Sequence, residues 1–193
     1  AREPLRRFYV CLVSPYGADP GACIDAVGER AVALVGGNHE HGAAGLMSLE
    51  WFNPVARAAA LWTRGQLPSD ALAWLGGLPL TAVIGDATLA HASPSHPEEW
   101  DYLLSAEDGF GVFGAFETRL CFVGHSHRPR VWSLGSSGPE HAGRFTAWPA
   151  EVPLGDGRRY LVNVGSVGQP RDRDPRAAFR DAWLEGTDRK SVG

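Results

Sequence analysis

The sequence predicts an α/β protein with a parallel sheet. Near its N-terminal end, a short apolar run at 8–13 is followed by a helical pattern at 21–29 and by a second apolar run at 31–35. A strand, a helix and a strand at this spacing form a βαβ unit, in which the two strands run parallel. Helical patterns fill the middle of the chain, and its C-terminal third is rich in short apolar runs separated by turns.

Capping residues and prolines mark where the helices begin. Asp19 followed by Pro20 combines a capping carboxylate with a proline in the first turn, and this pair predicts the start of the helix at 21–29. Four more helices are expected at 53–66, 68–75, 97–104 and 112–117.

Short apolar runs bounded by turn residues predict the remaining strands. The runs at 78–84 and 87–90 are joined by Gly85-Asp86, a pair that favours a two-residue hairpin turn. Four further strands are expected at 120–123, 130–134, 144–148 and 160–164.

Length and charge narrow the class of protein. We expect the 193 residues to form a single domain over 1–193, with 181–193 as a frayed tail. A formal net charge of −4 without a long basic block argues against a nucleic-acid binder, and we expect no nucleic-acid groove. No apolar run approaches the roughly 18 residues of a membrane span, so no membrane attachment is expected.

Three cysteines without a Cys-x-x-Cys pair favour a reducing, cytoplasmic setting, in which Cys11 and Cys121 fill the core.

Two histidines follow the strand expected at 120–123. The stretch Gly124-His125-Ser126-His127 places them two residues apart, and in an extended segment such side chains point the same way. His125 and His127 could therefore present their rings to one place. The alternative is a polar loop with two solvated histidines.

Three other loops carry similar groups after apolar runs. Asn38-His39 follows the run at 31–35, His91 follows 87–90, and the glycine-bearing segment 163–168 follows the last expected strand. The carboxyl ends of parallel strands are where α/β proteins place ligands. Neutral imidazole suits Zn, Mn, Fe and Ni, and the Asn amide supplies a neutral oxygen. A lone histidine at a strand end is more often structural, but four such loops together favour a metal site.

These motifs resemble a known family. Gly37-Asn38-His39-Glu40, His91 and Gly124-His125-Ser126-His127 resemble, in order and spacing, the later motifs of the calcineurin-like metallophosphoesterases. The segment 163–171 resembles the loop that follows them in the bacterial phosphodiesterase and diadenosine-tetraphosphatase-like branch. The resemblance covers about 10–179, and it implies a two-sheet β-sandwich with helices on both outer faces, an αββα fold.

The resemblance also implies roles for individual residues. In that family, the amide matching Asn38 binds the second metal and the phosphate, and the histidines matching His91 and His125 bind the same metal. The histidine matching His127 binds the first metal. The one matching His39 interacts with the phosphate and is the catalytic acid that protonates the leaving oxygen. A metal-bound hydroxide attacks phosphorus, so the implied activity is hydrolysis of phosphomonoesters or phosphodiesters with Mn, Zn, Fe or Ni.

The chain departs from the family near its N-terminal end. No Asp-x-His precedes the strand expected at 8–13, and 11–17 lacks the Gly-Asp whose carboxylate bridges both metals. The fold is therefore expected to be N-terminally incomplete. The remaining ligands are neutral, and two divalent ions close together repel strongly without carboxylates. We expect at most one ion, at Asn38, His91 and His125, with His127 left without its metal. Conceivable substitute ligands are Asp19, Glu40, His41 and Asp86.

The function that follows is a metal-dependent phosphoesterase, a hydrolase whose activity in this chain the missing ligands could impair. The alternative is a non-catalytic remnant or truncated member that keeps at most one metal site. A structural zinc protein ranks below both, because no thiolate joins the ligands. The expected partner is a small-molecule phosphoester or a phosphoprotein substrate, and exposed strand edges favour self-association. Trp51, Phe52 and Trp100 could line a base-binding pocket, although packing is the commoner role of such residues.

Overall fold

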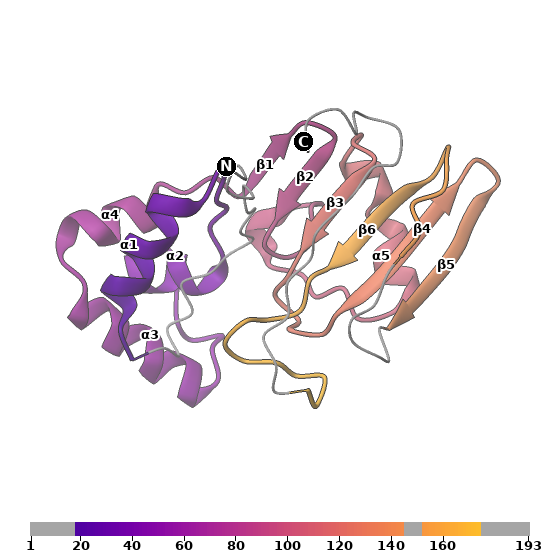
Figure 1. Ribbon diagram of the computed structural model, residues 1–193. Helices are drawn as coiled ribbons and strands as arrows, with labels where there is room; N and C mark the ends of the chain where they lie inside the picture. Colours follow the sequence, from indigo (N-terminus) through magenta and orange to yellow (C-terminus); the bar gives the residue numbers. More distant parts are fainter. Residues whose placement is uncertain (1–17, 145–151, 175–193) are drawn as a thin grey trace.

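The computed structural model describes residues 18–144 and 152–174 (Figure 1). Three expected features lie wholly or mostly outside these residues: the strand at 8–13, the strand at 144–148 and the tail at 181–193. The same is true of Cys11 and of the stretch where the family's first two motifs would stand.

The strands form one mixed sheet of six, in the order β1-β2-β3-β6-β4-β5 (Figure 1). Their bounds are Thr81–Ile84 for β1, Ala87–Ala90 for β2, Leu120–Val123 for β3, Arg130–Gly135 for β4, Gly138–Arg144 for β5 and Arg159–Asn163 for β6. β2, β3 and β6 are parallel, and every other neighbouring pair is antiparallel. The three parallel strands therefore end at one edge of the sheet, where their loops meet.

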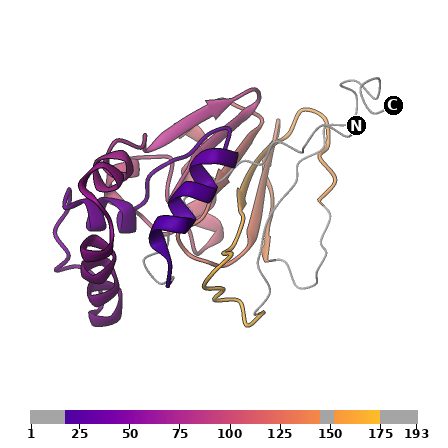
Figure 2. The ribbon, with the colours of Figure 1, turned by 60° about the vertical axis from the view of Figure 1, so that its left-hand side comes forward.

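Four helices gather beside the β1–β2 part of the sheet, as Figures 1 and 2 show from two sides. They are α1 Pro20–Arg30, α2 Asn38–Ala44, α3 Pro54–Gln66 and α4 Ser69–Gly76. α5, Ala106–Gly111, lies against β4 and β5 instead. Two short 3₁₀ turns complete the described elements, η1 at Pro97–Glu99 and η2 at Phe113–Ala115. None of the helices in 18–144 and 152–174 has the length and apolar character needed to cross a membrane.

Side chains along the strands point alternately to the two faces of the sheet, and a hydrophobic cluster lies on each face. On β6, Tyr160 and Val162 pack with Leu120 and Val131 on one face, while Leu161 packs on the other. The second face is covered by side chains from the α5–η2 region, namely Leu103, Val112, Phe113 and Phe116. A separate cluster of Ile24, Leu67 and Leu75 holds the helices together. Burying each of these side chains contributes on the order of 1.5–3 kcal/mol.

Several expected elements form as predicted. The sheet with its helices confirms the α/β class. The hairpin of β1 and β2 turns at 85–86, and α1, α3, α4, β3, β4 and β6 lie where the sequence predicts them to within a few residues. All described strands belong to one sheet, so the second sheet of the expected sandwich stays a prediction.

The strand predicted at 31–35 is wrong. The run at 31–35 forms no strand, apart from a single bridge at Ala31. The next residue, Gly36, instead donates its backbone N–H to the carbonyl of Pro79 at 2.9 Å. A short apolar run signals burial but not a strand as such. The parallel pairing consequently comes from β2, β3 and β6, not from a βαβ unit at the N-terminal end.

The helices expected at 97–104 and 112–117 also differ. The first is reduced to η1, because His96 and Trp100 on either side of it have positive φ angles of 50° and 58°. The second prediction is wrong as well, because 112–117 holds only η2 and the helix α5 lies just before it. At the start of α5, Ser105 accepts from the N–H of Asp108 and the Asp108 carboxylate accepts from the N–H of Ser105. This reciprocal capping box defines the helix start at Ala106 more strongly than the apolar spacing at 112–117.

Candidate metal centre

Asn38, His91 and His125 converge at the carboxyl edge of the parallel strands. The Nε2 atom of His91 lies 3.0 Å from the Oδ1 atom of Asn38 and 3.0 Å from the Nδ1 atom of His125. The three side chains are far apart in sequence. His91 follows β2, His125 follows β3, and Asn38 is the first residue of α2.

Backbone contacts fix the loops that carry these side chains. The N–H of Gly124 donates to the carbonyl of His91 at 2.9 Å, which ties the loop after β3 to the loop after β2. At the start of α2, the Glu40 carboxylate accepts from the N–H of Gly37 at 3.0 Å. This contact holds the first turn of the helix, and with it Asn38.

His125 and His127 both adopt the left-handed backbone region, with φ of 60° and 56°. The prediction that they stand in an extended segment is therefore wrong, and their rings have different partners. His125 meets His91, whereas the Nδ1 atom of His127 donates to the carbonyl of Gln169 at 2.7 Å. Non-glycine residues in this region are uncommon and cost on the order of 1–3 kcal/mol each, and they cluster at functional sites.

Asn163 stabilises this strained loop. The residue is 1% exposed, and its Nδ2 atom donates to the Gly124 carbonyl at 2.5 Å and to the Ser126 hydroxyl at 3.0 Å. Its Oδ1 atom accepts from the N–H of Gly165 at 3.0 Å. One buried amide thus connects the histidine loop to the loop after β6. Sequence reasoning singled out the segment that begins at Asn163 but gave this residue no role, although a polar residue ending an apolar strand was the available signal.

Burial keeps the site histidines neutral. Loss of solvent is the largest cause in each case: it lowers the pKa of His39 to about 4 and that of His125 to about 3. The pKa of His91 falls well below its usual value, through burial and then through the charge of neighbouring His125. The pKa of His127 is lowered as well, by burial and then by Arg171. At neutral pH each ring therefore keeps a nitrogen lone pair.

The donor set fits a divalent cation. An ion with bonds of about 2.1 Å holds adjacent octahedral ligands about 3.0 Å apart, which is the separation between His91 Nε2 and its two neighbours. Two imidazoles and one amide make up this set. Within 18–144 and 152–174, no group of three or more His, Cys, Asp or Glu side chains could hold a metal. The second ring nitrogen of His91, Nδ1, is buried and has no hydrogen-bond partner among those residues.

Aromatic rings surround the histidines. Tyr102 stacks on His125 with ring centroids 4.0 Å apart, and Trp100 meets the rings of His91 and His41 edge-on at 5.8 and 5.2 Å. Phe52 meets His39 at 4.9 Å. Of the aromatic residues considered from the sequence, Phe52 and Trp100 lie at the site, whereas Trp51 is 89% exposed. Tyr102 was missed, because a single tyrosine in an irregular segment gives no periodic signal.

The conceivable substitute ligands have structural roles. Asp86 accepts from the N–H of Arg119 at the opposite end of the sheet, and Asp19 precedes α1 as its cap residue. Glu40 caps α2 as described. His41 packs against Trp100, and burial lowers its pKa. None of these contacts brings a carboxylate oxygen to the three donors.

Comparisons with known proteins agree with these motifs. The chain is 40% identical to a metallophosphoesterase from Sphaerobacter thermophilus of known crystal structure, with a TM-score of 0.63 over 82% of this chain and 64% of that one. It is 36% identical over 170 residues to an uncharacterized protein of Methanocaldococcus jannaschii, covering 85% of this chain and 65% of the relative. The chain therefore spans slightly under two thirds of both proteins.

A hypothetical protein from Pyrococcus horikoshii OT3 shares the fold. It is 14% identical, with a TM-score of 0.56 over 84% of this chain and 64% of that one. No family model matches the chain. Similarity to a metallophosphoesterase of the same fold supports the superfamily that the motifs indicate.

Proposed function

We propose that this chain is a metal-dependent phosphoesterase of the calcineurin-like superfamily, in which Asn38, His91 and His125 hold one divalent cation. The observation that carries the proposal is that two neutral donors, the Oδ1 atom of Asn38 and the Nδ1 atom of His125, each lie 3.0 Å from a third, the Nε2 atom of His91. Support comes from the 40% identity to a metallophosphoesterase. The combination of imidazole with an amide oxygen suits Mn, Zn, Fe or Ni.

A bound divalent cation supplies Lewis-acid chemistry toward a phosphoryl group. The protein's own part is to hold the donors in place and to keep them unprotonated. Burial keeps the imidazoles unprotonated, since it lowers the pKa of both His91 and His125. Two hydrogen bonds hold the donors in place: the Gly124 N–H donates to the His91 carbonyl, and the Asn163 amide donates to the Gly124 carbonyl.

His39 is the proposed general acid, and together with Asn38 it contacts the substrate phosphate. Its pKa of about 4 leaves the ring neutral at neutral pH in the metal-free protein, through burial and then through the charges of His127 and Arg171. An anionic phosphate beside the ring raises this pKa, because the opposite charge favours the imidazolium. Substrate binding itself therefore prepares His39 to give a proton to the leaving oxygen.

His127 is the proposed ligand of a first metal in the family, but its surroundings differ here. Its Nδ1–H is directed to the Gln169 carbonyl, which leaves Nε2 with the lone pair. In the described part of the chain His127 belongs to no group of three or more His, Cys, Asp or Glu side chains that could hold a metal. We therefore propose at most one ion per chain. A non-catalytic remnant with one metal site is the second candidate, favoured by the absence of such a group around His127 among the described residues.

Hydrolysis of an aryl phosphomonoester and of a bis-aryl phosphodiester, with and without Mn²⁺, tests the proposal. We expect turnover that requires the metal, is abolished by a chelator, and falls at least about 100-fold in His39→Ala, as expected for loss of an acid catalyst. His141→Ala, at an exposed histidine of β5, is the matched control and should keep full activity. Metal-independent turnover, or full activity in His39→Ala, would contradict the proposal. Metal binding without turnover of any ester would favour the remnant.

A further inference from the structure

The loop after β6 brings a guanidinium to the histidine cluster. The backbone N–H of Arg171 donates to the carbonyl of His127 at 3.1 Å, and the Arg171 side chain donates to the Gln169 Oε1 atom at 3.0 Å. Gln169 is the residue whose carbonyl accepts from the His127 ring, and its own N–H donates to the Ser166 hydroxyl at 3.0 Å. These hydrogen bonds join the backbone of Arg171 to the loop that carries His125 and His127.

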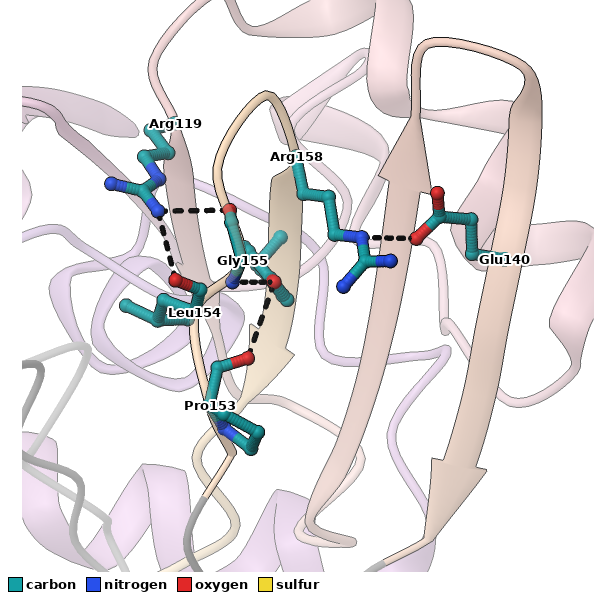
Figure 3. Close-up of polar contacts among 7 residues, drawn as sticks. Arg119, Glu140, Pro153, Leu154, Gly155 and Arg158 are labelled. Carbon is teal, nitrogen blue, oxygen red and sulfur yellow. Dashed lines mark hydrogen bonds and ion pairs between the residues drawn. The ribbon is translucent and has the colours of Figure 1, made fainter.

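Three arginines at the start of the parallel strands have structural partners, and Figure 3 shows two of them, Arg119 and Arg158. At the opposite end of the sheet, Arg119 donates to the carbonyls of Leu154 and Gly155, and Arg158 pairs with the Glu140 carboxylate at 2.5 Å. Arg159 donates to the Phe116 carbonyl. Arg171 differs from these three arginines, because its side chain is exposed and forms no ion pair with any residue in 18–144 and 152–174.

The charge of Arg171 reaches three histidines of the site. It lowers the pKa of His39, His125 and His127, in each case after the larger effect of burial. Two acidic groups next to these residues in the sequence have other partners: Glu40, beside His39, accepts from the N–H of Gly37, and Asp172, beside Arg171, accepts from the N–H of Asp174. A permanent positive charge beside neutral imidazoles makes the site attractive to an anion even before any cation binds.

We propose that Arg171 receives the phosphoryl oxygens of the substrate and makes the site prefer a phosphomonoester dianion over a phosphodiester monoanion. This inference rests on the proposed function and adds a substrate class to it. A guanidinium presents paired N–H donors that match two oxygens of one phosphate, and such charge-assisted contacts are strong. A terminal phosphate offers three free oxygens and about two negative charges above its second pKa of roughly 6, whereas a diester offers two oxygens and one charge.

Anion binding to metal-free protein tests the inference separately from catalysis. In EDTA at about pH 8, above the second pKa of phosphate, titration calorimetry with inorganic phosphate and with dimethyl phosphate compares the dianion with a diester. We expect the wild type to bind phosphate more tightly than dimethyl phosphate. Arg171→Gln should weaken phosphate binding about tenfold, the loss of one charge-assisted contact, and Arg171→Lys should restore part of it.

Arg173→Gln is the matched control, because it removes the same charge two residues away from an exposed side chain. It should leave phosphate binding unchanged. Equal weakening by both Gln variants, unchanged binding in Arg171→Gln, or no phosphate binding by the wild type would each overturn the inference.

Activity assays separate this inference from the proposed function. In the Mn²⁺-loaded protein, Arg171→Gln should lower the ratio of kcat/KM for the aryl monoester to that for the diester about tenfold. Turnover with an unchanged ratio would support the proposed phosphoesterase activity and contradict the proposed role of Arg171. Phosphate binding that depends on Arg171, in a protein without turnover, would support the anion site and contradict the proposed phosphoesterase activity.

Discussion

At the scale of single residues, burial decides what the site histidines can do. His91 lies against both His125 and Asn38, and both histidines are buried, so that protonating either would place a charge where water cannot stabilise it. Neutral rings are the form that binds a metal. The same burial gives the metal-free protein a stability that depends on pH.

The free energy of unfolding of the metal-free protein should fall as the pH is lowered from about 6.5 toward 3. Unfolded histidines take up protons near pH 6.5, whereas folded His39 and His125 do so only at about 4 and about 3. Between these values the unfolded state binds more protons, so stability is fully present above 6.5 and declines by about 1.4 kcal/mol per pH unit for each such histidine. Urea unfolding in EDTA at a series of pH values measures the slope. His125→Asn should reduce it, and an unchanged slope would contradict this reasoning.

Asn163 should be required for the geometry of the histidine loop. Asn163→Asp keeps the acceptor for Gly165 but loses both donated hydrogen bonds and buries a charge, which should cost about 3 kcal/mol or more. Metal affinity should fall with it. Asn53→Asp is the control: Asn53 caps α3 by accepting from Ala56, and a carboxylate accepts equally well. A similar melting temperature for both variants would show that Asn163 does not hold the loop.

At the scale of elements, the sequence predicted those helices and strands well whose start or turn is specified by neighbouring residues. The Gly85-Asp86 turn and the Asn53-Pro54 cap specify their hairpin and helix through nearby residues alone. The run at 31–35 and the segment at 97–104 depend on distant partners instead. Trp100 leaves helical geometry in a segment whose ring contacts are with His41 and His91, and neither contact is visible in the sequence around Trp100.

The packing of α5 on the sheet should be sensitive to one methyl group. A Cβ atom added at Gly109 would lie 2.3 Å from the Trp132 ring, which is itself fully buried, so Gly109→Ala should destabilise the protein by about 1–3 kcal/mol or more. Gly111→Ala, in the same helix with nothing within 4 Å of the added atom, should be neutral or slightly stabilising. Denaturant unfolding of both variants measures the difference. Equal stabilities would mean that α5 does not pack as described.

At the scale of the whole molecule, one end of the parallel strands carries the histidines and the other is closed by arginine contacts to loop carbonyls (Figure 3). The resemblance of the sequence motifs to a known family grouped Asn38, His91 and His125, and these side chains do meet at the first end. Strand ends predicted the place of His91 and His125 but not that of Asn38, because the run at 31–35 forms no strand. The left-handed conformations of His125 and His127, the stacking of Tyr102 and the placement of Arg171 could not be predicted. They depend on how separate loops pack together.

The β1 edge of the sheet should promote self-association. β1 is terminal in the described sheet, and its Val83 side chain is 66% exposed. Unpaired strand edges with apolar side chains pair readily with other copies, and a lysine on such an edge opposes this. Sedimentation velocity over a concentration series should show association that Val83→Lys reduces. Arg128→Lys, which preserves the charge of an exposed side chain, is the control. A monomer at all concentrations would refute the prediction.

The number of metal ions per chain, measured by Mn²⁺ titration with elemental analysis, tests the central claim most directly. We predict one ion for the wild type, loss of that ion in His91→Ala, and its retention in His127→Ala, because only His91 touches both other donors. Two ions per chain, or one ion that survives His91→Ala but not His127→Ala, would contradict the account.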